Sequence, residues 1–123
     1  GKDIIRFIML TRKNDMVLDF DIKLAQEQSK DNPVFYVQYA FARINSIIKN
    51  LTESAPEIIE EFNKGKNYYL ETLSSNEEIE LIKFLSNFPR IVELSALHYE
   101  PHRIAFYLIE LAALFHNFWS KGK

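Results

Sequence analysis

The longest helical pattern in the chain begins at Asn32 and runs to Leu51. Asn32 is a favoured N-cap residue, and Pro33 suits the first helical position, where a backbone N–H is not needed. Apolar residues then recur every three or four positions, which predicts an amphipathic helix with one buried stripe. The stripe comprises Val34, Val37, Phe41, Ile44, Ile48 and Leu51. We expect the rest of the chain to be organised around this helix.

A second row of side chains lies on the same predicted helix. Tyr36, Tyr39 and Arg43 follow one another at i, i+3 and i+7, so they share a face separate from the apolar stripe. Two phenols and a guanidinium are suited to stacking on bases and pairing with phosphate. The same tyrosines would also fit the boundary of a core, with their hydroxyls in water. The spacing leaves both interpretations open.

The remaining segments predict shorter helices. A capping-box pattern at Ser75 and Glu78 begins one of them. Leu18 and Phe20 are expected to pin a polar loop to the core, and Gly65 lies in a polar connection. The predicted short helices cover about residues 3–10, 21–28, 56–62, 75–85 and 90–99, and Ile91, Leu94, Ala96 and Leu97 are available for burial in the last of these. No alternating pattern predicts a sheet, so we predict an all-α helical bundle of about five or six helices.

The last predicted helix, which begins at Pro101, is apolar on two sides. One stripe comprises Ile104, Tyr107, Leu108, Leu111, Phe115 and Phe118, and a second, nearly opposite, comprises Phe106, Ile109 and Ala113. A helix with two apolar sides is normally buried on both. It is therefore predicted to be the centre of the bundle or to be flanked by a segment absent from this chain.

Composition limits the possible functions. The 123 residues are predicted to form one domain, 47% hydrophobic and 26% charged, with a net charge of -2. A net negative charge argues against binding nucleic acid through the overall charge of the chain, so any RNA contact would depend on a few side chains at one site. The chain has no cysteine, which excludes disulfides and thiolate metal sites and hints at an intracellular protein. There is no apolar run of membrane-spanning length and no signal-peptide pattern.

We expect no catalytic residue and no metal site in this chain. The sequence has neither a phosphate-binding glycine loop nor a nucleophile-elbow pattern. His98 and His102 are four residues apart, which on one helix would allow a shared metal. Pro101 lies between them, and a helix usually ends before the residue that precedes a proline. Both histidines are therefore interpreted as surface residues at a junction.

The last helix carries other polar candidates. Arg103, Asn117 and Lys121 share one face, which is either solvated or available to a phosphate. Trp119 lies at the edge of the main stripe, where it is either part of the core or has one ring face available for stacking. His116 lies between the two apolar stripes and is interpreted as a structural or boundary residue.

Three stretches together resemble arginyl-tRNA synthetase, and specifically the C-terminal anticodon-binding domain of this class I enzyme. They are LDFD at 18–21, QSKDNPVFYVQYAFARINSI at 28–47 and EPHRIAFYLIELAALFHNFW at 100–119. The opening DIIRFIMLTRKND resembles the segment after the family's KMSKR-type loop. The family usually has QYAHAR where this chain has Phe41, interpreted here as a packing substitution because Phe41 falls on the predicted core stripe. The family's domain also continues beyond the last helix, so we expect this chain to be a fragment that lacks a closing helix.

The resemblance implies a domain that binds the tRNA anticodon arm and does not aminoacylate alone. Arginylation, with its ATP and Mg, would belong to a catalytic domain of the same parent chain in the cytoplasm. The implied partner is arginine-accepting tRNA, and the resemblance implies no binding to DNA or to a membrane. Tyr36, Tyr39 and Arg43 match the family's anticodon-facing helix, Trp119 matches an aromatic position near the anticodon, and Arg103 is a further candidate for tRNA contact.

Two other functions stay open from the sequence. The two-sided last helix would also suit a non-catalytic helical protein–protein interaction module. The second of these alternatives is a metal-dependent enzyme that uses His98 and His102.

Overall fold

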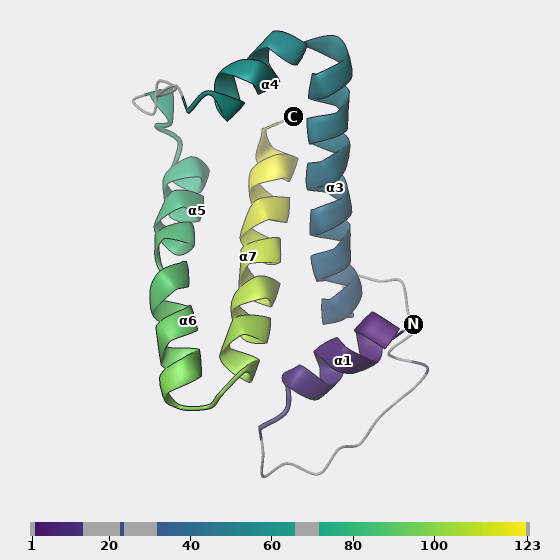
Figure 1. The fold of residues 1–123 in the computed structure, drawn as a ribbon, viewed down its shortest axis with the longest axis vertical. Helices are drawn as coiled ribbons and strands as arrows, with labels where there is room; N and C mark the ends of the chain where they lie inside the picture. The colour runs from purple at the N-terminus through teal and green to yellow at the C-terminus, as the bar shows by residue number, and fades with distance from the viewer. Residues whose placement is uncertain (1, 14–22, 24–31, 66–71, 123) are drawn as a thin grey trace.

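In the computed structural model, which describes residues 2–13, 23, 32–65 and 72–122, the helices lie largely side by side (Figure 1). The described part contains six helices: α1 (Lys2–Leu10), α3 (Pro33–Ser54), α4 (Pro56–Asn63), α5 (Asn76–Ser86), α6 (Phe88–Leu97) and α7 (His102–Lys121). The described residues form no strand, and the predicted all-α bundle is confirmed. The expected helix at 21–28 and the anchors Leu18 and Phe20 lie outside the described residues.

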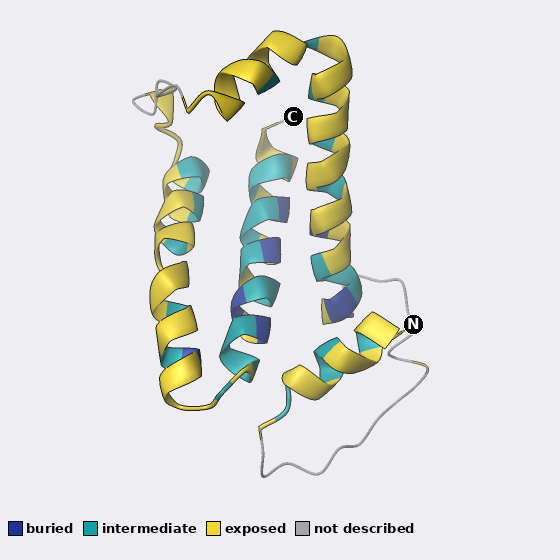
Figure 2. Cartoon of the chain, in the orientation of Figure 1, coloured by how far each residue is buried: buried dark blue, intermediate teal, exposed yellow. Residues whose placement is uncertain are grey.

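The centre of the bundle is α7, one of the two arrangements that its apolar pattern predicted. It contacts α3 on one side and both α5 and α6 on the other. The predicted burial of its second stripe is wrong, because Phe106 is 44% exposed and Ala113 is exposed as well. Helices α3 and α7 run in the same direction, while α5 and α6 follow each other in the opposite direction (Figure 1). The buried positions lie mainly on α7 and at the start of α3 (Figure 2). Among the described residues, the buried apolar ones are Val34, Ala40, Ala105, Tyr107 and Ala112.

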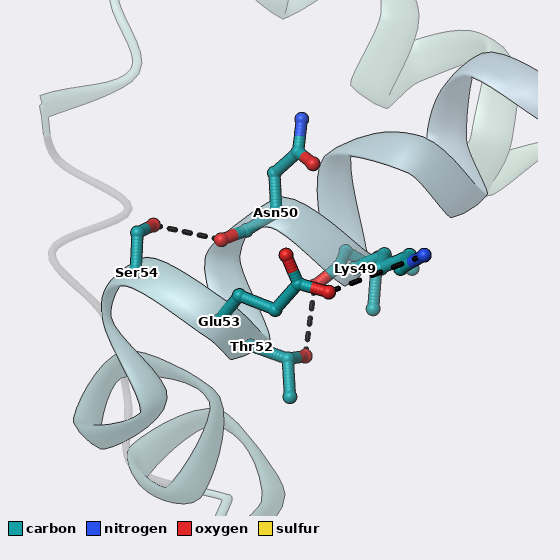
Figure 3. A network of polar contacts seen from close by, with 6 residues as sticks. Lys49, Asn50, Thr52, Glu53 and Ser54 are labelled. Carbon is teal, nitrogen blue, oxygen red and sulfur yellow. Dashed lines mark hydrogen bonds and ion pairs between the residues drawn. The ribbon is translucent and has the colours of Figure 1, made fainter.

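The beginning of α3 confirms the predicted cap. The Asn32 side chain accepts hydrogen bonds from the backbone N–H groups of Val34 and Phe35, and Pro33 opens the helix. The other end stops at Ser54 because Pro56 disfavours a helical residue before it. Around this end, Thr52 and Ser54 hydroxyls donate to carbonyls one turn earlier, and Lys49 pairs with Glu53 at 4.0 Å (Figure 3). These exposed contacts join residues within α3 only and contribute little to the stability of the fold.

The predicted buried stripe of α3 is wrong for its middle part. Phe41 is 70% exposed, and Ile44 and Ile48 are exposed as well. The side of α3 that is buried or half-buried instead follows Tyr36, Ala40, Arg43, Ile47 and Leu51. The two stripes are displaced by one residue, or about 100° around the helix. Since α7 flanks α3 from one direction, it covers only one of them (Figure 2). Phe41 is therefore not a packing substitution within this bundle.

The burial predicted for α6 is also only partly confirmed. Ile91 and Leu94 are half-buried as predicted, whereas Ala96 and Leu97 are exposed. Ser95 takes the buried position, where its hydroxyl donates to the Glu100 carbonyl at 2.9 Å and closes the α6–α7 turn. At the other connection, Gly65 ends α4 with a φ of +66°, a left-handed conformation that glycine adopts without strain.

The capping box of α5 provides a stability prediction. The Ser75 hydroxyl accepts from the Glu78 N–H, and the Glu78 carboxylate accepts from the Ser75 N–H. These bonds hold the pKa of Glu78 below its usual value. Ser75→Ala should lower the free energy of unfolding by about 1 kcal/mol in urea titrations, because an N–H of the first turn loses its partner. Ser74→Ala is the control, since Ser74 contributes only its backbone N–H. Equal losses for both variants would contradict the capping role.

Candidate functional site

Five side chains from two helices meet where α3 crosses the second half of α7. Tyr36, Tyr39 and Arg43 come from α3, and His116 and Trp119 come from α7. We call this group the α3–α7 cluster. Small buried residues on both helices, Ala40 and Ala112 among them, permit the close approach that brings the larger side chains together.

His116 is at the centre of the cluster and is only 6% exposed. Its ring centre lies 4.4 Å from that of Tyr36 and 5.1 Å from that of Tyr39, and the Tyr39 ring is stacked on it. Nε2 lies 3.2 Å from the Tyr36 carbonyl oxygen, and Nδ1 lies 3.4 Å from Nη1 of Arg43. The imidazole therefore links the backbone of α3 to the guanidinium.

Arg43 occupies the edge of the cluster. Its Nη2 donates to the Tyr39 hydroxyl, and its Cζ lies 4.5 Å from the Tyr39 ring centre and 5.7 Å from the Trp119 ring centre. The two hydrogen-bond contacts use two of the five N–H donors of a guanidinium. A cation held between aromatic rings, with further donors, is suited to a phosphate or a base edge.

Four of the five residues predicted from the sequence are thus brought together, but not on an open face. Tyr39 is 43% exposed, whereas Tyr36 and Arg43 are half-buried against α7, and Trp119, on α7 itself, is also half-buried. Tyr36 and Arg43 therefore lie at the boundary of the core, one of the two interpretations that the spacing left open, because this is the side of α3 that packs on α7. What reaches the surface is the outer edge of the cluster, formed by Tyr39 with parts of Arg43 and Trp119.

Arg103 does not belong to this cluster. It lies thirteen residues before His116 on α7, which corresponds to about 20 Å along the helix. Its guanidinium pairs with the Glu100 carboxylate, and this hydrogen bond lowers the pKa of Glu100. Arg103 lines a groove between α6 and α7, together with Arg90, Phe106 and Tyr107.

The other polar candidates of the sequence also lie elsewhere. Lys121 donates to the Glu77 carboxylate at 2.5 Å; the bond raises the pKa of Lys121 and lowers that of Glu77. His98 follows the end of α6 and His102 begins α7, so the two histidines are not on one helix. Across the residues that the structure describes, no group of three or more metal-ligating side chains occurs.

None of the helices in the described ranges is long and apolar enough to cross a membrane.

The sequence interpretation missed the part played by His116. The signal that was available is its register with the small residues of α7: Ala105, Ala112 and His116 follow at intervals of seven and four, which places them on one stripe. Alanines on a central helix indicate where a neighbouring helix approaches most closely. A histidine on that stripe is buried and must find hydrogen-bond partners on the neighbour.

The fold and the cluster define an all-α domain with an aromatic and cationic edge. Residues 37–123 match the model of the DALR anticodon binding domain, and the chain belongs to this family. It is 56% identical over all 123 residues to the arginine–tRNA ligase of Rickettsia felis and 55% identical to that of Rickettsia prowazekii. The chain spans 21% of the length of each of these relatives.

A solved structure agrees with the sequence comparison. A putative arginyl-tRNA synthetase from Campylobacter jejuni superposes with a TM-score of 0.82 at 28% identity, covering 100% of this chain and 26% of that protein. The resemblance to arginyl-tRNA synthetase that the sequence indicated is thereby confirmed.

Proposed function

We propose that residues 1–123 bind the anticodon arm of arginine-accepting tRNA as one domain of a cytoplasmic arginine–tRNA ligase. The parent chain would supply the catalytic domain, with ATP and Mg, and this domain would position the tRNA for arginylation. The observation that carries the proposal is the outer edge of the α3–α7 cluster, where Tyr39, Arg43 and Trp119 place a guanidinium among aromatic rings.

Recognition of an anticodon loop fits the chemistry of this edge. Unpaired loop bases stack on aromatic side chains, and each such stack is worth about 1–3 kcal/mol. Tyr39 offers the more exposed ring and Trp119 the larger one. Arg43 would pair with a loop phosphate and so fix the register of the bases. Such a local contact is compatible with a net charge of -2.

The test is a comparison of two tRNAs on the full-length parent enzyme. Its dissociation constants for arginine tRNA and for the same tRNA with a substituted anticodon are measured by gel-shift titration. We expect the substituted tRNA to bind more weakly by about fivefold or more, the equivalent of losing one base contact. Equal affinity for both tRNAs would contradict anticodon recognition.

A second role is favoured by a separate observation, the exposed apolar stripe at Phe41, Ile44 and Ile48. Such a stripe is typical of a surface that contacts protein. The catalytic domain of the parent chain is the partner that we propose for it. The alternative is a non-catalytic helical protein–protein interaction module. It would be supported if the protein bound no tRNA and formed a dimer at increasing concentration that Ile44→Ser abolished.

A further inference from the structure

The hydrogen-bond contacts of His116 indicate which of its two ring nitrogens carries the proton. Carbonyl oxygens only accept hydrogen bonds, so Nε2, at 3.2 Å from the Tyr36 carbonyl, must carry a proton. Guanidinium groups only donate, so Nδ1, at 3.4 Å from Arg43 Nη1, must accept. Both contacts are satisfied by one form of the ring, the neutral tautomer with its proton on Nε2.

These contacts also restrain Arg43. An arginine on a helix surface normally samples many rotamers, and immobilising it when a ligand binds costs affinity. Here the guanidinium is held from two sides, by Nδ1 of His116 and by the hydroxyl of Tyr39. The His116 ring is in turn restrained by its contacts with the rings of Tyr36 and Tyr39 and with the backbone of α3.

We propose that His116 is a positioning residue for RNA binding: its neutral imidazole accepts from Arg43 and holds the guanidinium in its RNA-binding position before the tRNA arrives. The inference rests on the proposed function. His116 is itself buried and does not touch the RNA, so its contribution passes through Arg43. The loss of the acceptor should then weaken tRNA binding about two- to tenfold, the scale of immobilising one long side chain.

Two substitutions of equal shape test this role in the full-length parent enzyme. His116→Leu removes the acceptor, while His116→Asn keeps an oxygen near the position of Nδ1. We expect His116→Leu to weaken arginine-tRNA binding two- to tenfold and His116→Asn to retain most of the affinity. A merely structural role would give the opposite order, because leucine suits a buried site better than asparagine.

A double-mutant cycle connects the effect to Arg43. In an Arg43→Ala background, His116→Leu should change the affinity by less than about twofold, because the group that it positions is gone. If Arg43→Ala weakens binding and His116→Leu in the wild-type background does not, the positioning role is overturned while the proposed function stands. If Arg43→Ala itself has no effect, the proposed function fails, and this inference fails with it.

A measurement on the unmutated enzyme covers the case in which His116→Leu does not fold. The ¹⁵N shifts of labelled histidine distinguish the two neutral tautomers and the imidazolium, and His116→Asn identifies the signal by its loss. At neutral pH we expect His116 to carry its proton on Nε2, with Nδ1 unprotonated. A proton on Nδ1 would overturn the inference, because that nitrogen could not then accept from Arg43.

Discussion

Tyr107→Ala should lower the free energy of unfolding of this chain by about 3–5 kcal/mol, the usual cost of removing a large buried aromatic ring. Tyr107 is 5% exposed, and its ring lies 4.7 Å from that of Phe84 and 5.4 Å from that of Phe88, measured between centres. It therefore joins the central helix α7 to the end of α5 and the start of α6. The loss is measured by urea unfolding followed by circular dichroism.

Two control variants accompany Tyr107→Ala: one removes only the hydroxyl of Tyr107, and the other replaces an exposed tyrosine. The Tyr107 hydroxyl donates to the Phe84 carbonyl at 3.1 Å, so Tyr107→Phe should cost about 1 kcal/mol. Burial raises the pKa of this hydroxyl, so it stays a donor throughout the neutral range. Tyr99→Asn, at an exposed position with a φ of 55° that asparagine tolerates, should change stability little. A loss below about 1 kcal/mol for Tyr107→Ala would contradict this account of the core.

Arg43→Ala should weaken arginine-tRNA binding by the full-length parent enzyme about ten- to a hundredfold, the range of a lost hydrogen bond between charged groups. The reason is that Arg43 is the cation of the α3–α7 cluster and would pair with a loop phosphate. The plot of log affinity against log salt should also become shallower by about 0.7, the value for one phosphate on a single strand.

Lys64→Ala is the matched control for charge. Lys64 follows α4, pairs with Glu60 at 3.6 Å and has no contact with the cluster among the described interactions. Its removal lowers the net charge by the same amount, so it should leave the affinity nearly unchanged. Equal weakening by Lys64→Ala would mean that the tRNA responds to overall charge, and not to the position of Arg43.

The sequence was sufficient to predict the elements that depend on local chemistry. The Asn32 cap, the Ser75–Glu78 capping box and the helix starts near Pro33, Pro56 and Pro101 each arise from hydrogen bonds or backbone restraints within a few residues. The central place of α7 was one of the two arrangements that its apolar pattern allowed. The pattern did not predict which side chains are buried there, because Phe106 and Ala113 of the second stripe are exposed.

What could not be predicted was which side of α3 its neighbour would cover. The apolar stripe through Phe41 and the row through Tyr36 and Arg43 are only one residue apart in register, and both are able to pack on a helix. Small residues on α7 favour the row with Ala40, and this information lies about seventy residues away in the sequence. The same long-range pairing decides that His116, and not Arg103, joins the tyrosines.

Photo-crosslinking from position 39 tests most directly whether the edge of the α3–α7 cluster meets the anticodon loop. A benzophenone amino acid replaces Tyr39 in the full-length parent enzyme, the complex with arginine tRNA is irradiated, and the crosslinked nucleotide is mapped. The same amino acid in place of Tyr99, which is exposed and remote from the cluster, is the control. We predict crosslinks from position 39 to nucleotides of the anticodon loop and none there from position 99. Crosslinks from position 39 only to the acceptor stem or another arm would contradict the account.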